Sequence, residues 1–247
     1  MSAEAAFEVE GLGHRFGARR VLREISFAIG AGDFTVLLGL NGAGKTTLFS
    51  LATRLYASDE GVIRVFADDL RTRPSACLRQ MGVVFQQPTL DLELSVTSNL
   101  LFHAGLHGIP RSIARTRIEK ELARLGLADR AHDKTATLSG GNRRRIELAR
   151  SLLHEPRVLL MDEATVGLDP ASRSELLRSL LALRSERGVA VLWATHLCDE
   201  VSDADRVIVM HRGKVLSDTS PAELLVATGA DSVEQAFLAM TGAPERV

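Results

Sequence analysis

The stretch that decides the fold is GLNGAGKTT, residues 39–47, which follows directly on the apolar run FTVLL at residues 34–38. Its first eight residues fit the pattern GxxxxGK followed by Ser or Thr, and this pattern belongs between a strand and a helix. The apolar run supplies the strand, and residues 47–55 have the pattern of a helix. A plain glycine turn is the alternative, but so many constrained positions in this context favour a loop that cradles a polyphosphate.

The residue types in this loop suit an anion. Backbone N–H groups must point inward around the phosphates, and glycine permits the backbone angles and the close approach that this needs. The helix that follows begins with free N–H groups and a partial positive charge. Lys45 is placed to reach the β- and γ-phosphates, and the Thr46 hydroxyl to bind Mg²⁺. The sequence therefore predicts a nucleoside triphosphate site, with ATP or GTP undecided, made of Gly39, Asn41, Gly42, Ala43, Gly44, Lys45, Thr46 and Thr47.

Further apolar runs predict the rest of a sheet. Residues 158–161, 189–193 and 207–210 are apolar almost throughout, and residues 83–85 are a shorter candidate. Continuous rather than alternating runs are typical of strands buried on both faces, as in a parallel sheet. Helical patterns lie between several of these runs, including the stripe from Leu176 to Leu181. Strands interleaved with helices predict an α/β fold.

Other regions depart from this pattern. Residues 7–12 and 21–29 are separated by a turn-like segment and read as an antiparallel hairpin added to the main sheet. A mostly helical region then lies between two strands, and the end of the chain has two weak helical patterns. We expect one domain, residues 1–247, whose parts are a core lobe at 7–94 and 156–220, an inserted helical lobe at 95–155 and a tail at 221–247.

Two acidic residues and a histidine follow buried runs. Asp162 and Glu163 come directly after residues 158–161, where open α/β sheets bind ligands. Asp162 is placed to hold Mg²⁺, and Glu163 to polarise the attacking water as a general base. A lone Asp-Glu pair would read as a solvated loop, but the phosphate loop reverses that interpretation. His196 ends another buried run, where it would hydrogen-bond a γ-phosphate or the attacking water.

A second glycine-rich helix start lies at residues 138–142, LSGGN. Ser139 is a good N-cap, and Gly140 and Gly141 leave further N–H groups free, so a second anion site is expected at a second helix N-terminus. Two phosphate sites in one chain suggest one nucleotide held between two copies. The arginines at 143–145 are either a nucleic-acid patch or a charged first helical turn, partly near phosphate and partly solvated.

Composition narrows these alternatives. The net charge of −1, with 25% charged residues, gives no basic excess, so nucleic acid is not expected as a partner. Cys77 and Cys198 form no metal-like pair, which favours a reducing cytosol. No apolar run approaches the roughly 20 residues that span a bilayer, and the start has no basic signal region. Five histidines show no spacing typical of metal ligands, namely His103, His107, His132, His154 and His211.

The order of these motifs resembles the ATP-binding cassette family over nearly the whole chain. GLNGAGKTT is similar to the Walker A loop, LSGGN to the signature, and LLMDEATVGLDP to Walker B and the D-loop, whose aspartate would be Asp169. VVFQQP resembles the Q-loop, with Gln86 as its glutamine, and ATH resembles the switch histidine. Phe16 lies where the family carries an aromatic residue that stacks on adenine.

The resemblance implies a fold and a site. The fold is a P-loop NTPase with a RecA-like parallel-sheet core, an N-terminal antiparallel β subdomain and an inserted α-helical subdomain. Members bind two MgATP between two head-to-tail cassettes, each ATP touching the Walker loops of one copy and the signature of the other. The resemblance thus implies catalytic roles for Lys45, Gln86, Glu163 and His196, magnesium contacts from Thr46, Gln86 and Asp162, and nucleotide contacts from Phe16, Ser139, Gly140, Gly141 and Asp169.

The resemblance also implies partners. The chain would be a peripheral homodimer on the cytoplasmic face of the inner membrane, driving separate permease subunits. Its end, SVEQAFLAMTG, is similar to bacterial export-type cassettes, and other phrases resemble a subgroup associated with quinone-dependent alcohol dehydrogenase systems. A non-transport cassette for translation or repair is the alternative. Leu40, Ala164 and Asn142 depart from the commonest family pattern, and only Asn142, in place of glutamine, changes a polar side chain.

Overall fold

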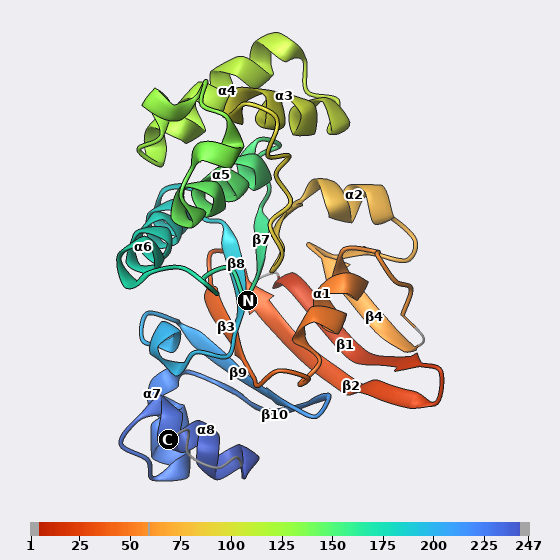
Figure 1. Cartoon of the computed structure of the whole chain (residues 1–247). Helices are drawn as coiled ribbons and strands as arrows, with labels where there is room; N and C mark the ends of the chain where they lie inside the picture. Colours follow the sequence, from red (N-terminus) through yellow and green to blue (C-terminus); the bar gives the residue numbers. More distant parts are fainter. Residues whose placement is uncertain (1–4, 59, 243–247) are drawn as a thin grey trace.

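The main sheet has six strands in the order β10-β9-β3-β8-β7-β6. The computed structural model describes residues 5–58 and 60–242 (Figure 1). The five strands from β9 to β6 are parallel, and β10 pairs antiparallel with β9 at one edge. The strands of this sheet are β3 (Phe34–Leu38), β6 (Met81–Val84), β7 (Val158–Asp162), β8 (Ala190–Thr195), β9 (Arg206–His211) and β10 (Lys214–Thr219).

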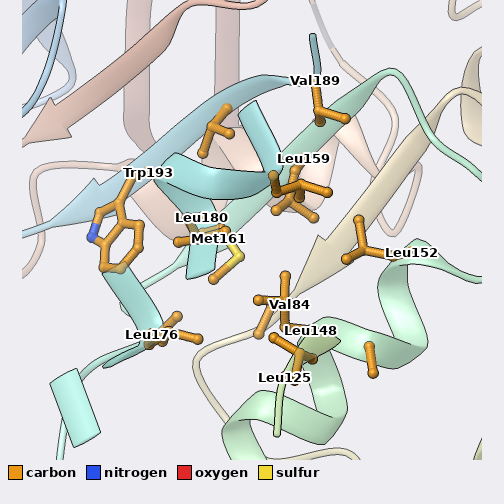
Figure 2. Packing of buried hydrophobic residues seen from close by; sticks show 14 of the residues in the cluster. Val84, Leu125, Leu148, Leu152, Leu159, Met161, Leu176, Leu180, Val189 and Trp193 are labelled. Atoms are coloured by element: carbon orange, nitrogen blue, oxygen red, sulfur yellow. The ribbon is translucent and has the colours of Figure 1, made fainter. Parts of the chain in front are cut away.

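The strands β3, β7, β8 and β9 of the main sheet are buried on both faces, as their continuous apolar runs predict. Phe34, Val36 and Leu38 of β3 belong to one core cluster, and Leu37 between them belongs to the other. The same alternation holds along β7, β8 and β9. In the first cluster, Figure 2 shows side chains of β7 and β8 facing those of α5 (Gly140–Leu152) and α6 (Pro170–Arg187). The α/β fold class is therefore confirmed.

The N-terminal hairpin forms a sheet of its own, so the expectation that it is added to the main sheet is wrong. This sheet has the order β2-β1-β4-β5, and its strands are β1 (Ala5–Phe16), β2 (Arg19–Gly30), β4 (Glu60–Val65) and β5 (Asp68–Asp69). Its long strands alternate, with Phe7 and Val9 buried and Glu8 between them half-buried. Such strands have one apolar face, whereas a central strand of the main sheet needs two. That apolar face joins the second core cluster.

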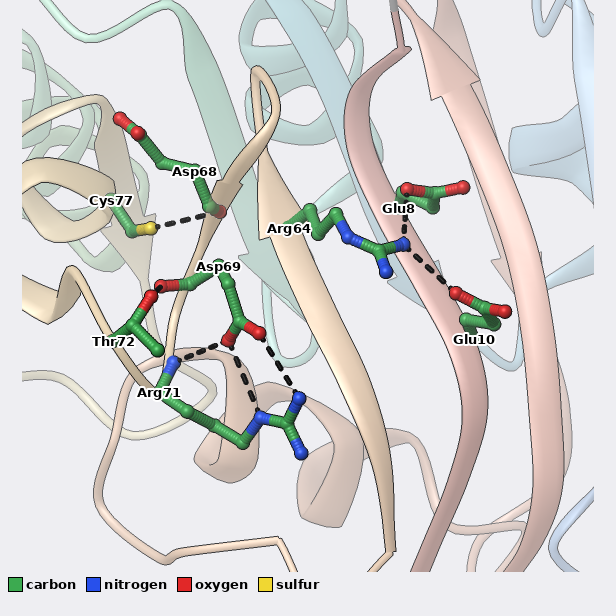
Figure 3. A network of polar contacts seen from close by, with 8 residues as sticks. All are labelled: Glu8, Glu10, Arg64, Asp68, Asp69, Arg71, Thr72 and Cys77. Atoms are coloured by element: carbon green, nitrogen blue, oxygen red, sulfur yellow. Dashed lines mark hydrogen bonds and ion pairs between the residues drawn. The ribbon is translucent and has the colours of Figure 1, made fainter.

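The other face of this small sheet carries ion pairs. Arg64 of β4 donates from one Nη atom to Glu8 and to Glu10 of β1, both at 2.9 Å (Figure 3). Asp69 of β5 accepts from the backbone and the guanidinium of Arg71. These side chains are partly or largely exposed, and such pairs typically contribute less than about 1 kcal/mol. The buried apolar face therefore positions this sheet.

Two groups of helices lie at opposite ends of the molecule. Figure 1 shows α3, α4 and α5 gathered at one end of the molecule, and α7 and α8 at the opposite end. The predicted helical character of residues 95–155 is borne out by these elements, whereas the division of the chain into lobes stays a prediction. The remaining helices are α1 (Lys45–Ala52), α2 (Pro74–Arg79), α3 (Val96–Leu106), α4 (Arg111–Arg124), α7 (Pro221–Thr228) and α8 (Val233–Thr241), with short 3₁₀ turns at Ala128–Arg130, Thr135–Thr137 and Cys198–Val201.

Both weak helical patterns of the tail form helices. Ser220 and Glu223 make a capping box at the start of α7, and Ser232 caps α8. Residues 243–247, which the predicted tail also includes, lie outside the described residues, as do 1–4 and 59. Among the helices in the described part of the chain, none is long and apolar enough to cross a bilayer.

Candidate active site

Four adjacent parallel strands end at the same edge of the main sheet, and each delivers a predicted site residue there. The phosphate loop follows β3, His196 follows β8, the Asp162-Glu163 pair ends β7, and Gln86 follows β6. Parallel strands bring their carboxyl ends together, and ligands of open α/β sheets bind at that edge. The topology thus brings together residues that are more than 100 positions apart in sequence.

The phosphate loop has a backbone that only glycine adopts easily. Gly42 and Gly44 have φ angles of 82° and 110°, in the left-handed region. A Cβ atom on Gly44 would lie 2.7 Å from a methyl of Leu22 and 2.9 Å from the methyl of Met210. Gly44 is also the N-cap of α1, so the helix starts at Lys45, two residues before the start predicted from sequence. The first N–H groups of α1 therefore open into the loop.

Glu163 is the centre of the polar cluster. Its Oε1 lies 3.1 Å from Lys45 Nζ, and its Oε2 accepts from Gln86 Nε2 at 3.2 Å and lies 3.3 Å from His196 Nδ1. Its backbone has φ of 45°, an uncommon conformation for glutamate, and its N–H donates to Ala194 of β8. The four predicted catalytic residues are thus within reach of one another, and their catalytic roles stay predictions.

Asp162 is the more deeply buried acid of the pair. It is 1% exposed, and burial raises its pKa to about 6, against the lowering effect of a hydrogen bond from the Thr46 hydroxyl. Its Oδ1 is buried without a hydrogen-bond partner. A buried carboxylate oxygen without a partner, beside the Thr46 hydroxyl, is the kind of oxygen ligand that Mg²⁺ prefers, and the Gln86 side chain lines the same cavity as Thr46. Thr46, Gln86 and Asp162 therefore fit the ion, which would neutralise phosphate charge when bound.

A cavity of about 360 Å³ opens over these groups. Phe16 stands at its side, 45% exposed, with its ring edge-on to the rings of His14 and Tyr56 at 4.7 and 5.4 Å. Gly39 and Ala43 do not line the cavity, although the Gly39 carbonyl accepts from Lys45 Nζ at 2.6 Å. The lining residues are Phe16, Arg19, Val21, Asn41, Gly42, Gly44, Lys45, Thr46, Thr47, Gln86 and Glu163.

The cavity includes residues that the sequence does not single out. Arg19 and Val21 of β2 line it, and Tyr56 packs against Phe16 next to it. Arg19 lies three residues after Phe16, the residue predicted to stack on adenine, and this closeness in sequence is the one signal that would have found it. Tyr56 lies just beyond α1 in a segment with no recognisable pattern, so sequence alone gives no reason to choose it.

The signature turn and Asp169 lie apart from this cavity. Ser139 caps α5 by accepting from the N–H of Asn142 at 3.2 Å, and Gly141 is buried against the side chain of Ser172. Asp169 caps α6 in the same way, and its hydrogen bonds from Ser172 lower its pKa. Ser139, Gly140 and Asp169 are exposed. None of these residues lines the cavity beside Lys45.

Arg144 corrects an expectation about the basic run. Its side chain is not solvated, because it is 5% exposed and bonded to the segment that carries Gln86. It donates to the carbonyls of Phe85 and Gln86 at 2.6 and 2.8 Å, and to Glu147 at 2.7 Å. The helix that begins at the signature is thus bonded to the segment that carries Gln86. Charge-assisted bonds of this kind are among the stronger ones in proteins.

Comparisons with known proteins agree with this geometry. The family model for ABC transporters matches residues 22–166. The linearmycin resistance ATP-binding protein LnrL of Bacillus subtilis is 33% identical over 92% of this chain and 73% of its own length. The sulfate/thiosulfate import ATP-binding protein CysA of Bordetella parapertussis is 41% identical over 89% of this chain and 63% of its own length.

A solved structure is similar in fold. The cbiO1 protein of Clostridium perfringens, described as part of the ABC transporter complex cbiONQ, has a TM-score of 0.83 and 31% identity over 90% of this chain and 91% of that one. With the family model and these relatives, this similarity shows that this chain belongs to the ABC transporter family, as an ATP-binding subunit that hydrolyses ATP.

Proposed function

We propose that two copies of this chain bind two MgATP between them, head to tail, and that closure and release of this pair drive a separate membrane permease. The observation that carries the proposal is the separation of two sets of groups. Lys45, Gln86 and Glu163 line one cavity, while the Ser139 turn and Asp169 lie exposed outside it. Exposed helix N-termini attract anions, so a second copy that presents this turn to the cavity would complete the site.

Within this arrangement the residues of the chain divide the work. Lys45 and the N–H groups of α1 hold the phosphates, and Phe16 stacks on the base. Glu163 accepts a proton from the attacking water. His196 and Gln86 hold the Glu163 carboxylate in position through their contacts with it. The bond from Arg144 to the Gln86 carbonyl would pass a change at Gln86 to α5.

We further propose export as the direction, at the cytoplasmic face of the inner membrane. The linearmycin resistance relative supports export by its name. We give it more weight than the sulfate import relative because this chain covers 73% of the resistance protein and only 63% of the import protein. The identity of the import relative is higher, so a transport assay decides between them. With the permease in inside-out vesicles, ATP added outside should drive cargo into the lumen, and ATP-driven release would contradict export.

The Glu163→Gln variant tests the head-to-tail site. Glutamine keeps the shape and one acceptor oxygen, enough for the contact with Lys45, but cannot act as a base, so we expect normal ATP binding and turnover at least about 100-fold lower. We expect the variant to form a dimer in MgATP, seen by light scattering after size-exclusion chromatography. Glu155→Gln, an exposed glutamate paired with Arg117, is the control and should behave as the parent chain. A monomer with normal turnover would contradict the proposal.

A further inference from the structure

Three histidines that the mechanism does not use meet at one place, so the expectation that the histidines have no arrangement typical of metal ligands is wrong for them. His103 and His107 are four residues apart on and just after α3, and His154 follows the end of α5. One ring nitrogen of each lies within 4.8 Å of those of the other two. The rings of His107 and His154 are nearly parallel, with centroids 4.0 Å apart, and His103 lies 4.7 Å from His107.

One histidine already has the tautomer that a metal requires. The Nε2 of His154 lies 2.9 Å from the carbonyl oxygen of Met81, the first residue of β6. A carbonyl only accepts, so Nε2 carries the proton and Nδ1 carries the lone pair. Metal-binding histidines commonly have this second contact, which fixes the ring and its tautomer. The Nδ1 of His154 is buried and has no hydrogen-bond partner.

A second lone nitrogen lies in the same cluster. The Nε2 of His103 is also buried without a partner. Burial, with the charge of Arg150 as a smaller cause, lowers the pKa of His103 to about 3, and burial lowers that of His154 to about 4. Both imidazoles are therefore neutral at pH 7 and have lone pairs to give. A packing role alone leaves two polar atoms unsatisfied, whereas a bound ion would satisfy both.

We propose that His103, His107 and His154 bind one divalent transition-metal ion of the Zn²⁺, Ni²⁺ or Cu²⁺ class. Three neutral imidazoles suit these ions, whereas Mg²⁺ and Ca²⁺ prefer oxygen ligands. In a tetrahedral zinc site the ligand nitrogens lie about 3.4 Å apart, so ring nitrogens within 4.8 Å of one another have to close by up to about 1.4 Å. Rotation of the two side chains on α3 supplies this movement. Solvent would provide the fourth ligand.

The ion would join α3 to a strand of the main sheet. His103 lies on α3 and His107 directly after it, whereas His154 is bonded to β6, the strand that leads to Gln86. Arg150 of α5, whose charge acts on His103, donates to the carbonyl of Thr89, three residues after Gln86. Its positive charge opposes a cation, although the negative charge of the nearby Glu147 offsets part of it. An ion here would fix α3 to the core independently of nucleotide.

Zinc binding by the full chain tests the site. The untagged protein, free of nucleotide and Mg²⁺, is titrated with Zn²⁺ by calorimetry and dialysed for metal analysis. We expect one ion per chain with micromolar or tighter affinity, and visible absorption bands when Co²⁺ replaces zinc. His107→Ala and His103→Gln should each weaken binding at least tenfold, while His132→Ala, an exposed histidine outside the cluster, should not.

The two variants keep the result interpretable. His103→Gln retains a polar side chain of similar size, and circular dichroism with thermal melting in the absence of metal checks that both variants fold. Folded variants that bind zinc as tightly as the parent would place the ion elsewhere, for example at Asp162, and would overturn the proposal. Absence of saturable zinc or Co²⁺ binding by the parent chain would overturn it too and leave the three rings as packing.

Discussion

Two helices of this molecule begin with glycine and free main-chain N–H groups, and they differ in what surrounds those groups. The start of α1 lies beside Lys45, Gln86 and Glu163 in a cavity of about 360 Å³. The start of α5 has the Ser139 cap and an exposed glycine, and lines no part of that cavity. Both carry the partial charge that attracts an anion, but only the first is joined by side chains that can do chemistry. The difference indicates one complete half of a site and one half that needs a second copy.

Lys45→Ala should have the largest effect on this comparison. It removes the charge that faces the β- and γ-phosphates, and we expect turnover to fall by about two to three powers of ten and ATP affinity to drop. It also leaves Glu163 buried without its partner, so the melting temperature should decrease. Steady-state ATPase rates and nucleotide titration measure the first effect. Lys134→Ala, an exposed lysine, is the control, and parent-like ATP affinity in Lys45→Ala would contradict the assignment.

We call the half-site at the start of α1 the α1 half, and the half-site at the start of α5 the α5 half. Asp162→Asn should separate stability from activity at the α1 half. The folded carboxyl has its pKa raised to about 6 from 3.8, so its charge destabilises the fold fully above pH 6, and this cost fades as the pH falls from 6 towards 4. Asparagine removes the charge, so we expect a gain on the order of 2 kcal/mol at pH 7.5 that shrinks as the pH falls and disappears below about pH 4. Urea unfolding in chelator measures it, and turnover with Mg²⁺ should still fall.

Asp169→Asn is the matched control for the opposite sign. The pKa of Asp169 is lowered by its bonds from Ser172, so its ionised form stabilises the fold above its unfolded pKa, and this contribution is lost as the pH falls. Replacing it should therefore never stabilise the chain at neutral pH. A gain of stability in Asp169→Asn, or none in Asp162→Asn, would show that burial does not set the cost at Asp162.

Ser139→Ala tests whether the α5 half acts on nucleotide at all. It removes a helix cap and should cost about 1 kcal/mol of stability, as should Ser232→Ala, which removes the same type of bond at 3.2 Å from α8. Only Ser139→Ala should also lower turnover, because only that hydroxyl would face a phosphate. Equal turnover in both variants would make Ser139 a cap and nothing more.

Mixing variants sharpens the same test. In a head-to-tail pair, a Lys45→Ala chain and a Ser139→Ala chain share one site with both defects and one site with neither. We therefore expect the mixture to hydrolyse ATP faster than the average of the two separate samples. If both half-sites acted within one chain, no intact site would form and the mixture would show only that average.

The sequence predicts the α1 half well because its signals are local. A glycine loop follows an apolar strand, the two acids end another, and parallel pairing then brings Glu163 and His196 to one edge. The features that the sequence does not predict depend on contacts between residues that are far apart along the chain. Arg144 reads as a solvated charge, and its partners at Phe85 and Gln86 lie 58 or more residues away. The separate sheet of the hairpin was missed because alternation shows one apolar face but does not say what covers it.

Asn142→Gln should have the smallest effect and says how the α5 half works. The Asn142 carbonyl oxygen accepts from Arg145 at 2.6 Å, away from the exposed Ser139 and Gly140. A glutamine is one methylene longer and keeps the amide, so we expect turnover to change by no more than about threefold, within the range of a single ordinary hydrogen bond. Asn142→Ala, which removes the acceptor, is the comparison. If both variants keep most of the activity, the second helix start binds through its main-chain N–H groups, as the first does. A complete loss in Asn142→Gln would instead mean that this side chain positions the turn.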